Sequence, residues 1–282
     1  MIISFASGKG GTGKTILATN MAAAVSRTEP VVYADCDVEE PNGHIFLSPG
    51  ELEKTDVTVN NPLIDLDKCT LCGICSDVCE FNAIAILGPE PLVFPSLCHS
   101  CGACAELCPE KAITEIPWKT GEIERGYSGK LTFFSGRLNI GEAMAPPVTK
   151  ALKKALSPDS TVIIDAPPGN SCPVIEAVHG SDFVVLVTEP TPFGLNDLEL
   201  AYKMVLKLGL PFGVVVNRSD IGDDRVEKFC ADNNIEILLR VPFDRELAGT
   251  YSRGELAIDK SDDFKKKLLE LYQKILSRTN YG

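Results

Sequence analysis

A glycine-rich segment near the start of the chain, residues 8–15 (GKGGTGKT), carries residue types that bind phosphate. It fits the pattern GxxxxGK[ST], in which backbone N–H groups surround phosphate while the lysine and threonine reach the β- and γ-phosphates and Mg²⁺. An apolar run precedes it and an apolar helical pattern follows, so we expect a loop between a strand and a helix. The predicted nucleotide-binding residues here are Gly8, Lys9, Gly10, Gly11, Thr12, Gly13, Lys14, Thr15 and Ile16.

Eight of the eleven cysteines form two copies of the pattern CxxCxxCxxxC, which is a metal-binding spacing. The copies are offset by 29 residues, and Ala83-Ile84 recurs at that offset as Ala112-Ile113, so a structural unit is repeated. Thiolates three residues apart can wrap a cuboidal iron–sulfur cluster. Zinc is the alternative, although structural zinc sites usually take two CxxC-like pairs. The cysteines are Cys69, Cys72, Cys75 and Cys79 in the first copy and Cys98, Cys101, Cys104 and Cys108 in the second.

Acidic side chains follow two apolar runs that we expect to be buried strands. Asp35 and Asp37 follow residues 31–34, and Asp165 follows residues 161–164. The carboxyl ends of parallel strands face the crevice where α/β sheets bind ligands. Asp165 is placed to hold Mg²⁺ through water, and Gly169 behind it can turn toward a γ-phosphate. The alternative for Asp35 or Asp37 is that one of them only caps the next turn.

A second lysine, Lys9, makes the loop resemble the deviant Walker A loop of the superfamily of MinD, chromosome-partitioning proteins and the nitrogenase iron protein. The resemblance implies a P-loop ATPase that forms a homodimer around sandwiched nucleotide, with Lys9 reaching the phosphates of the partner. Lys9, Lys14 and Asp37 are then the catalytic candidates, and Asp37 orients or deprotonates the attacking water. Thr15, Asp35 and Asp165 are the candidates for Mg²⁺, with Asp35 closest to the ion's outer shell.

The resemblance also implies where the base binds. Asn217 and Arg218 follow another apolar run and match the asparagine-arginine pair that reads adenine in this superfamily, and Pro242 lies on a loop that flanks the base. The segment through Asp220 also nearly matches the guanine-reading NKxD. We favour ATP over GTP, because the phosphate loop is of the ATPase subtype.

The cysteine spacing resembles that of bacterial ferredoxins with two [4Fe–4S] clusters, in which the fourth cysteine of each motif binds the other cluster. Glu80 follows Cys79 where the usual motif has proline. The resemblance assigns Cys69, Cys72, Cys75 and Cys108 to the first cluster, and Cys98, Cys101, Cys104 and Cys79 to the second.

Composition narrows the functional class of this 282-residue chain, which carries a net charge of −12 and is 44% hydrophobic. Half of the excess negative charge lies in residues 60–118, which argues against nucleic-acid binding. No signal peptide or apolar span is evident, so we expect a cytoplasmic protein, where cysteines bind metals rather than form disulfides. The last helix, expected at residues 262–277, is amphipathic; we expect it to pack on the sheet, with membrane binding as the less favoured alternative.

The expected fold is α/β: a doubly wound, mostly parallel sheet of the P-loop type, interrupted by an α+β ferredoxin domain. The expected boundaries are 1–59 for the first part of the ATPase domain, 60–118 for the insert and 119–282 for the second part. We expect irregular chain with two short strands at residues 119–136, and a helix at 148–156. Such a protein would couple ATP hydrolysis to electron transfer toward a redox partner. The alternatives are an assembly factor serving a metalloprotein client, or a redox-sensing positioning ATPase.

Overall fold

The computed structural model describes residues 1–157 and 160–279. Within them the main sheet has nine strands, in the order β11-β10-β9-β1-β8-β2-β7-β6-β3. Neighbours from β11 to β7 pair in parallel, whereas β6 and β3 pair antiparallel at one edge. The central parallel strands are apolar runs buried on both faces, as expected where helices cover both sides. The parallel strands are β1 (Ile2–Ser7), β2 (Val31–Asp35), β7 (Leu131–Leu138), β8 (Thr161–Pro168), β9 (Phe183–Thr188), β10 (Phe212–Asn217) and β11 (Ile237–Val241).

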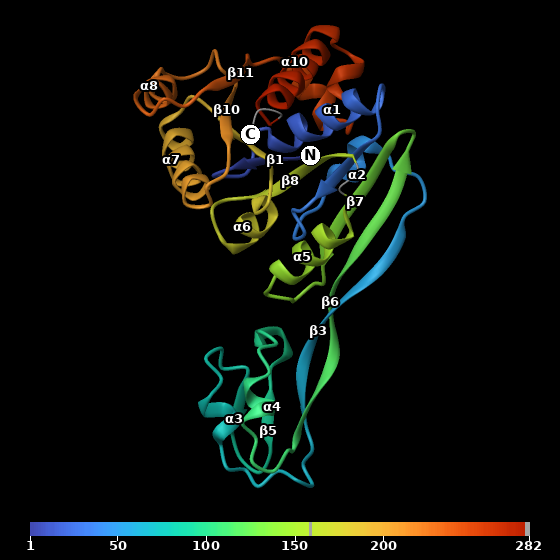
Figure 1. Cartoon of the computed structure of the whole chain (residues 1–282), viewed down its shortest axis with the longest axis vertical. Coiled ribbons are helices and arrows are strands. Elements are labelled where there is room, and N and C mark those ends of the chain that lie inside the picture. Colours follow the sequence, from blue (N-terminus) through green and yellow to red (C-terminus); the bar gives the residue numbers. More distant parts are fainter. Residues whose placement is uncertain (158–159, 280–282) are drawn as a thin grey trace.

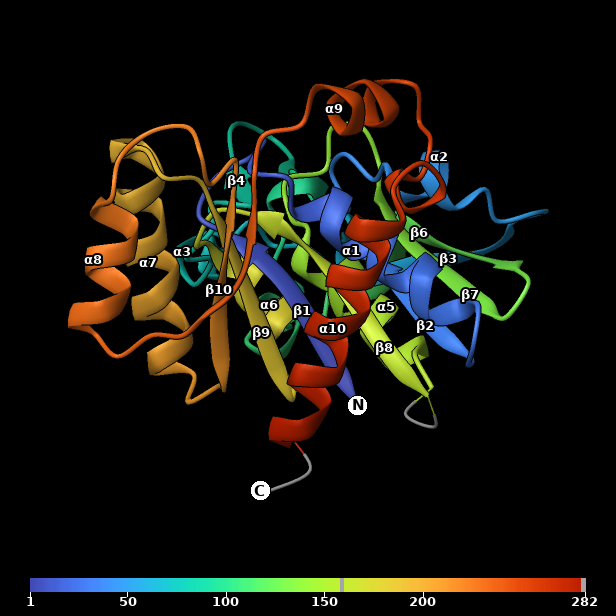
Figure 2. The ribbon, with the colours of Figure 1, turned by 90° about the horizontal axis from the view of Figure 1, so that it is seen from above.

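Helices cover both faces of this sheet, which confirms the predicted mostly parallel α/β fold (Figure 2). One face is packed by α1 (Lys14–Ser26) and α10 (Asp262–Thr279). The other is packed by α5 (Pro146–Ala155), α6 (Cys172–Val178), α7 (Pro192–Lys207) and α8 (Arg225–Asp232). Two shorter helices, α2 (Gly43–Leu47) and α9 (Arg245–Ser252), and a turn of 3₁₀ helix, η2 (Ala257–Asp259), lie in the connections.

The last helix packs against the protein itself. Its apolar stripe is buried in the core that α1 shares with the sheet, as its helical spacing predicted. The buried residues are Phe264, Leu268, Leu271, Tyr272 and Ile275. No helix within residues 1–157 and 160–279 has the length and apolar composition to cross a bilayer.

Two long strands at the sheet edge form an antiparallel ribbon that extends away from the sheet (Figure 1). They are β3 (Glu53–Ile64) and β6 (Ile113–Ser128), and their pairing runs from Glu53 opposite Arg125 to Ile64 opposite Ile113. The two short strands expected within residues 119–136 are parts of β6 and β7, but the irregular chain expected around them was wrong, because only the turn at residues 129–130 separates these strands. The part of β6 within this range buries Thr120, Gly121, Glu124 and Gly126 beside Ile123, so the buried positions carry polar residues and glycine and lack the apolar alternation that marks a half-buried strand. Its pairing partner also lies far away in the sequence.

The ribbon carries a small lobe, residues 65–112, at the end that lies away from the main sheet (Figure 1). The lobe contains α3 (Ile74–Asp77), α4 (Ala103–Glu106), the turn η1 (Pro95–Leu97), and a hairpin of β4 (Ile84–Ile86) and β5 (Pro91–Val93). The boundaries expected at 60 and 118 both fall inside the ribbon strands.

The 29-residue repeat seen in the sequence is also present in the backbone of the lobe. Positive φ angles recur in equivalent pairs, at 84° and 73° for Gly73 and Gly102 and at 57° and 54° for Leu71 and Ser100. A third pair of positive values lies at Asn82 and Lys111. Left-handed backbone outside glycine is uncommon, so three matched pairs indicate two copies of one loop–helix unit.

Candidate functional site

The phosphate-loop segment connects the carboxyl end of β1 to the start of α1. Gly13, directly before the helix, has a φ of 91°, which glycine adopts without strain. A Cβ at this position would lie 2.3 Å from Nδ2 of Asn217, so the available space also requires glycine. Among the described residues, no acceptor is found for the backbone N–H groups of residues 8–13. These donors and the free N–H groups of the first helical turn favour an anion at the loop.

Lys14 is buried beneath the loop in an ion pair with Asp165. Its Nζ lies 2.6 Å from Oδ1 of Asp165, and Tyr33 donates its hydroxyl to Oδ2 of the same carboxylate at 3.2 Å. Burial acts to lower the pKa of Lys14, but the Asp165 carboxylate opposes it and the pKa is raised. The lysine is therefore charged and lies beside the predicted magnesium residue. Sequence reasoning missed Tyr33, although a tyrosine within an apolar strand signals a buried hydroxyl that needs a partner.

The two acids after β2 differ in their surroundings. Asp35 is buried, and its oxygens accept backbone N–H groups from Asp37 at 3.2 Å, Asn42 at 3.0 Å and Gly43 at 2.8 Å. Burial, reinforced by Asp165, raises the pKa of Asp35 to about 7. Burial also raises the pKa of Asp37 to about 6, with Lys14 acting in the opposite direction. Asp35 thus holds the loop that carries Asp37, and a cation among these acids would stabilise their charged forms.

A pocket of about 260 Å³ adjoins the phosphate loop. It brings together the base-site candidates Asn217, Arg218 and Pro242 with Gly11, Gly13 and Ile16 of the loop and helix. Asn217 donates its Nδ2 to the carbonyl oxygen of Thr12 at 2.8 Å, so the end of β10 is fixed to the loop. Phe243 and Tyr251 complete the wall with aromatic surface. A pocket with apolar walls beside unpaired N–H donors has the form of a nucleotide site.

Glu189, which follows β9, joins two of the predicted residues and was missed in the sequence. Its Oε2 lies 3.9 Å from Nζ of Lys9, and its Oε1 lies 3.0 Å from a guanidinium nitrogen of Arg218. Glu189 is buried, whereas the side chain of Lys9 is 35% exposed. An acid at the carboxyl end of a buried strand was the available signal, as it was for Asp35 and Asp165.

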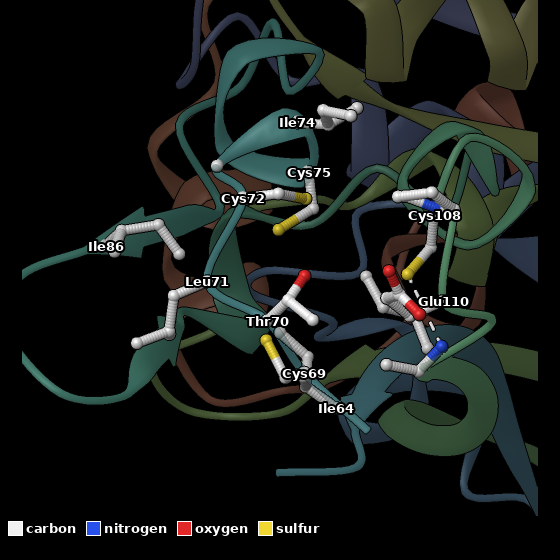
Figure 3. Close-up of a pocket in the computed structure, with 14 residues that line it drawn as sticks. Ile64, Cys69, Thr70, Leu71, Cys72, Ile74, Cys75, Ile86, Cys108 and Glu110 are labelled. Carbon is white, nitrogen blue, oxygen red and sulfur yellow. Dashed lines mark hydrogen bonds between the residues drawn. The ribbon is translucent and has the colours of Figure 1, made fainter. Parts of the chain in front are cut away.

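The eight cysteines of the lobe lie around two separate pockets. Figure 3 shows the first, with Cys108 facing the other three cysteines across the hollow. Each pocket combines three cysteines of one motif with the last cysteine of the other motif. The first is lined by Cys69, Cys72, Cys75 and Cys108, and the second by Cys98, Cys101, Cys104 and Cys79.

Backbone amides support the cysteine sulfurs in both pockets. Ala83 donates its N–H to Sγ of Cys79 at 3.2 Å, and the equivalent Ala112 donates to Sγ of Cys108 at 3.3 Å. The second pocket also contains Oγ of Ser100, a buried hydroxyl for which no partner is found among the described residues. Over the same residues, no three His, Cys, Asp or Glu side chains converge on the position of a single metal ion.

Comparison with known proteins identifies a sequence family and two relatives of this chain. Residues 3–258 match the family described as CbiA, the CobQ/CobB/MinD/ParA nucleotide-binding domain. The chain belongs to this family. Two relatives from Methanocaldococcus jannaschii match over nearly their whole length. The uncharacterized protein MJ0578 is 31% identical, with 98% of this chain and 96% of that protein covered, and MJ0579 is 30% identical, with 93% of each covered.

Solved structures of this family share the fold. The septum site-determining protein MinD of Pyrococcus horikoshii, complexed with Mg-ADP, has a TM-score of 0.61 at 17% identity and covers 97% of this chain and 95% of its own. The cell division ATPase MinD of Pyrococcus furiosus has a TM-score of 0.60 at 19% identity, and coverage is 98% for both chains. The chain therefore has the nucleotide-binding domain of the CobQ/CobB/MinD/ParA family, and its residues 65–112 form the cysteine-rich lobe.

Proposed function

We propose that the protein is an ATPase of the deviant Walker A class that couples a nucleotide-driven dimer cycle to electron transfer through two [4Fe–4S] clusters. One observation carries the proposal: the chain that holds the phosphate loop also holds two pockets lined by four cysteines each. Family membership and the structure of a relative with Mg-ADP support the nucleotide half.

The chain's own residues fit Mg-ATP. The unpaired N–H groups of residues 8–13 would bind the phosphates, and the pocket walled by Asn217, Arg218 and Pro242 would take the base. Thr15 and Asp165 offer hard oxygen ligands to Mg²⁺, with Asp35 behind them. Lys14 would turn from Asp165 toward the β- and γ-phosphates, and Asp37 would orient the attacking water. Lys9, partly exposed, would reach the phosphates of a second copy.

The cysteine lobe fits the proposed clusters. Each pocket offers four thiols, supporting N–H groups and glycine at the positive φ that lets the backbone approach closely. A bound cluster supplies one-electron chemistry. The crossed arrangement of the cysteines ties both motifs together, so clusters held in this way would serve as carriers rather than as cargo. The partner would be a redox protein that donates or accepts these electrons, and the free thiols suit a reducing cytoplasm.

Metal analysis of anaerobically purified protein tests the proposal. We expect about eight iron and eight sulfide per chain and electron paramagnetic resonance (EPR) signals from two reduced clusters. The crossed ligation gives a sharper test, because Cys75 and Cys79 belong to one motif but line different pockets. Cys75→Ala and Cys79→Ala should therefore impair different clusters, while Cys230→Ala, on α8, should keep both. Zinc without iron, or two variants that lose the same signal, would contradict the proposal.

A further inference from the structure

The two cysteine pockets are related by the repeat, yet their walls differ at one equivalent position. Leu71 and Ser100 have the same left-handed backbone, with φ of 57° and 54°, and each lies between the first two cysteines of its motif. Leu71 lines the first pocket and Ser100 lines the second. The same place in the two loops therefore carries an aliphatic side chain in one pocket and a hydroxyl in the other.

The hydroxyl of Ser100 lacks the partner that a buried polar group normally has. Its Oγ is inaccessible to solvent and has no hydrogen-bond partner among the described residues. A buried hydroxyl without a partner is energetically unfavourable, so a missing acceptor is expected nearby. The backbone N–H of Ser100 already donates to Sγ of Cys98 at 3.4 Å, so the residue lies against the cysteine ring.

We propose that Ser100 donates a hydrogen bond from its hydroxyl to the sulfur of the cluster in the second pocket and thereby gives that cluster the higher reduction potential of the two. This inference rests on the proposed function, because it needs the clusters. Hydrogen bonds to cluster sulfur stabilise the more negative, reduced state and raise the potential. Leu71 offers no such donor to the first cluster, and the neighbouring Thr70, which also lines that pocket, is an exposed residue whose hydroxyl water can satisfy.

The formal charge of the lining residues gives no reason for the two clusters to differ in reduction potential. One carboxylate lines each of them, Glu110 in the first and Glu115 in the second. The remaining contrast is polarity: the first pocket adds isoleucines and Thr70, an exposed residue, whereas the second adds the buried hydroxyl of Ser100 and the ring of His99, stacked on Phe81 at 3.5 Å between centroids. At equilibrium, a single electron in the lobe therefore resides mainly on the second cluster.

The test is an EPR-monitored redox titration of the full chain with both clusters present, compared with two variants. Ser100→Ala should lower the reduction potential of the second cluster by about 59 mV, which is a tenfold change in the equilibrium constant for one electron. Leu71→Ser, which adds a hydroxyl to the lining of the first pocket, should raise the reduction potential of the first cluster. Ser96→Ala, on η1 and outside both pockets, serves as the control. The couple that persists in Cys79→Ala identifies the first cluster.

Two outcomes separate this inference from the function on which it rests. If both clusters are present but Ser100→Ala leaves both couples unchanged, or shifts both equally, the role of Ser100 is overturned while the proposed function stands. If the unaltered protein contains no clusters, the proposed function itself fails.

Discussion

Among single residues, Lys14 is the one that we expect to decide whether nucleotide binds. Lys14→Ala should abolish ATP binding because it removes the charge beneath the phosphate loop. It also leaves Asp165 buried without its ion-pair partner, which should lower the free energy of unfolding by about 3 kcal/mol. The clusters, in a separate lobe, should remain. A fluorescent ATP analogue measures affinity, chemical denaturation measures stability, and Lys203→Ala on α7 is the control. Undiminished ATP affinity would refute the role of Lys14.

Lys9 is expected to act on hydrolysis rather than on binding. Lys9→Ala should reduce ATP turnover by at least about tenfold, because a positive charge placed against the transferring phosphate stabilises the transition state. The affinity for ATP should stay within about twofold, since a lysine from the partner subunit adds little to binding by the monomer. Steady-state hydrolysis and equilibrium binding separate the two effects. Unchanged turnover would exclude a catalytic role for this lysine.

Asn217 fixes the base pocket to the phosphate loop through its bond to the carbonyl oxygen of Thr12. Asn217→Ala should weaken nucleotide binding by about tenfold, since the buried carbonyl of Thr12 loses its donor and the pocket loses the side chain proposed to contact the base. Titrations with ATP and GTP, compared with Asn233→Ala at the end of α8, measure the effect. If GTP binds more tightly than ATP to the unaltered protein, the assignment of the base is wrong.

Among secondary-structure elements, the ribbon of β3 and β6 makes the lobe separable from the sheet. Ile64 lies opposite Ile113 at the end of the pairing, so a two-residue Asn-Gly turn can replace residues 65–112 and close a β-hairpin. The shortened protein should fold, bind ATP with unchanged affinity and contain no iron. Binding measurements and metal analysis check this expectation. Loss of nucleotide affinity would show that the lobe helps to build the nucleotide site.

Local sequence patterns predicted the elements that bury apolar residues and missed those that do not. The strand ends carrying Asp35, Asp165 and Asn217 were predictable because apolar runs precede them. The outer half of β6 was not, because a ribbon exposed on both faces has no apolar alternation and its partner lies far away in the sequence. Glu189 also follows an apolar run, so its place at a strand end was predictable, but its contacts with Lys9 and Arg218 join three distant segments and were not.

For the complete chain, the segment between β7 and α5 offers a physical connection between the nucleotide site and the ribbon. Leu138 donates its N–H to the carbonyl of Val38, directly after Asp37, at 2.8 Å. Asn139 bonds through Nδ2 to the carbonyl of Lys119 on the ribbon at 2.9 Å, and Trp118 donates its indole N–H to Glu142 at 2.8 Å. A shift of the Asp37 loop on binding nucleotide would therefore act on the strands that carry the lobe.

The most direct measurement of the proposed coupling is an anaerobic redox titration of both clusters without nucleotide, with Mg-ADP and with a slowly hydrolysed Mg-ATP analogue. We predict that nucleotide shifts at least one couple by about 59 mV, which is tenfold in equilibrium constant for one electron. If both clusters have the same midpoint potentials in all three titrations, and nucleotide is shown to be bound where it was added, coupling between ATP and the cluster potentials is contradicted.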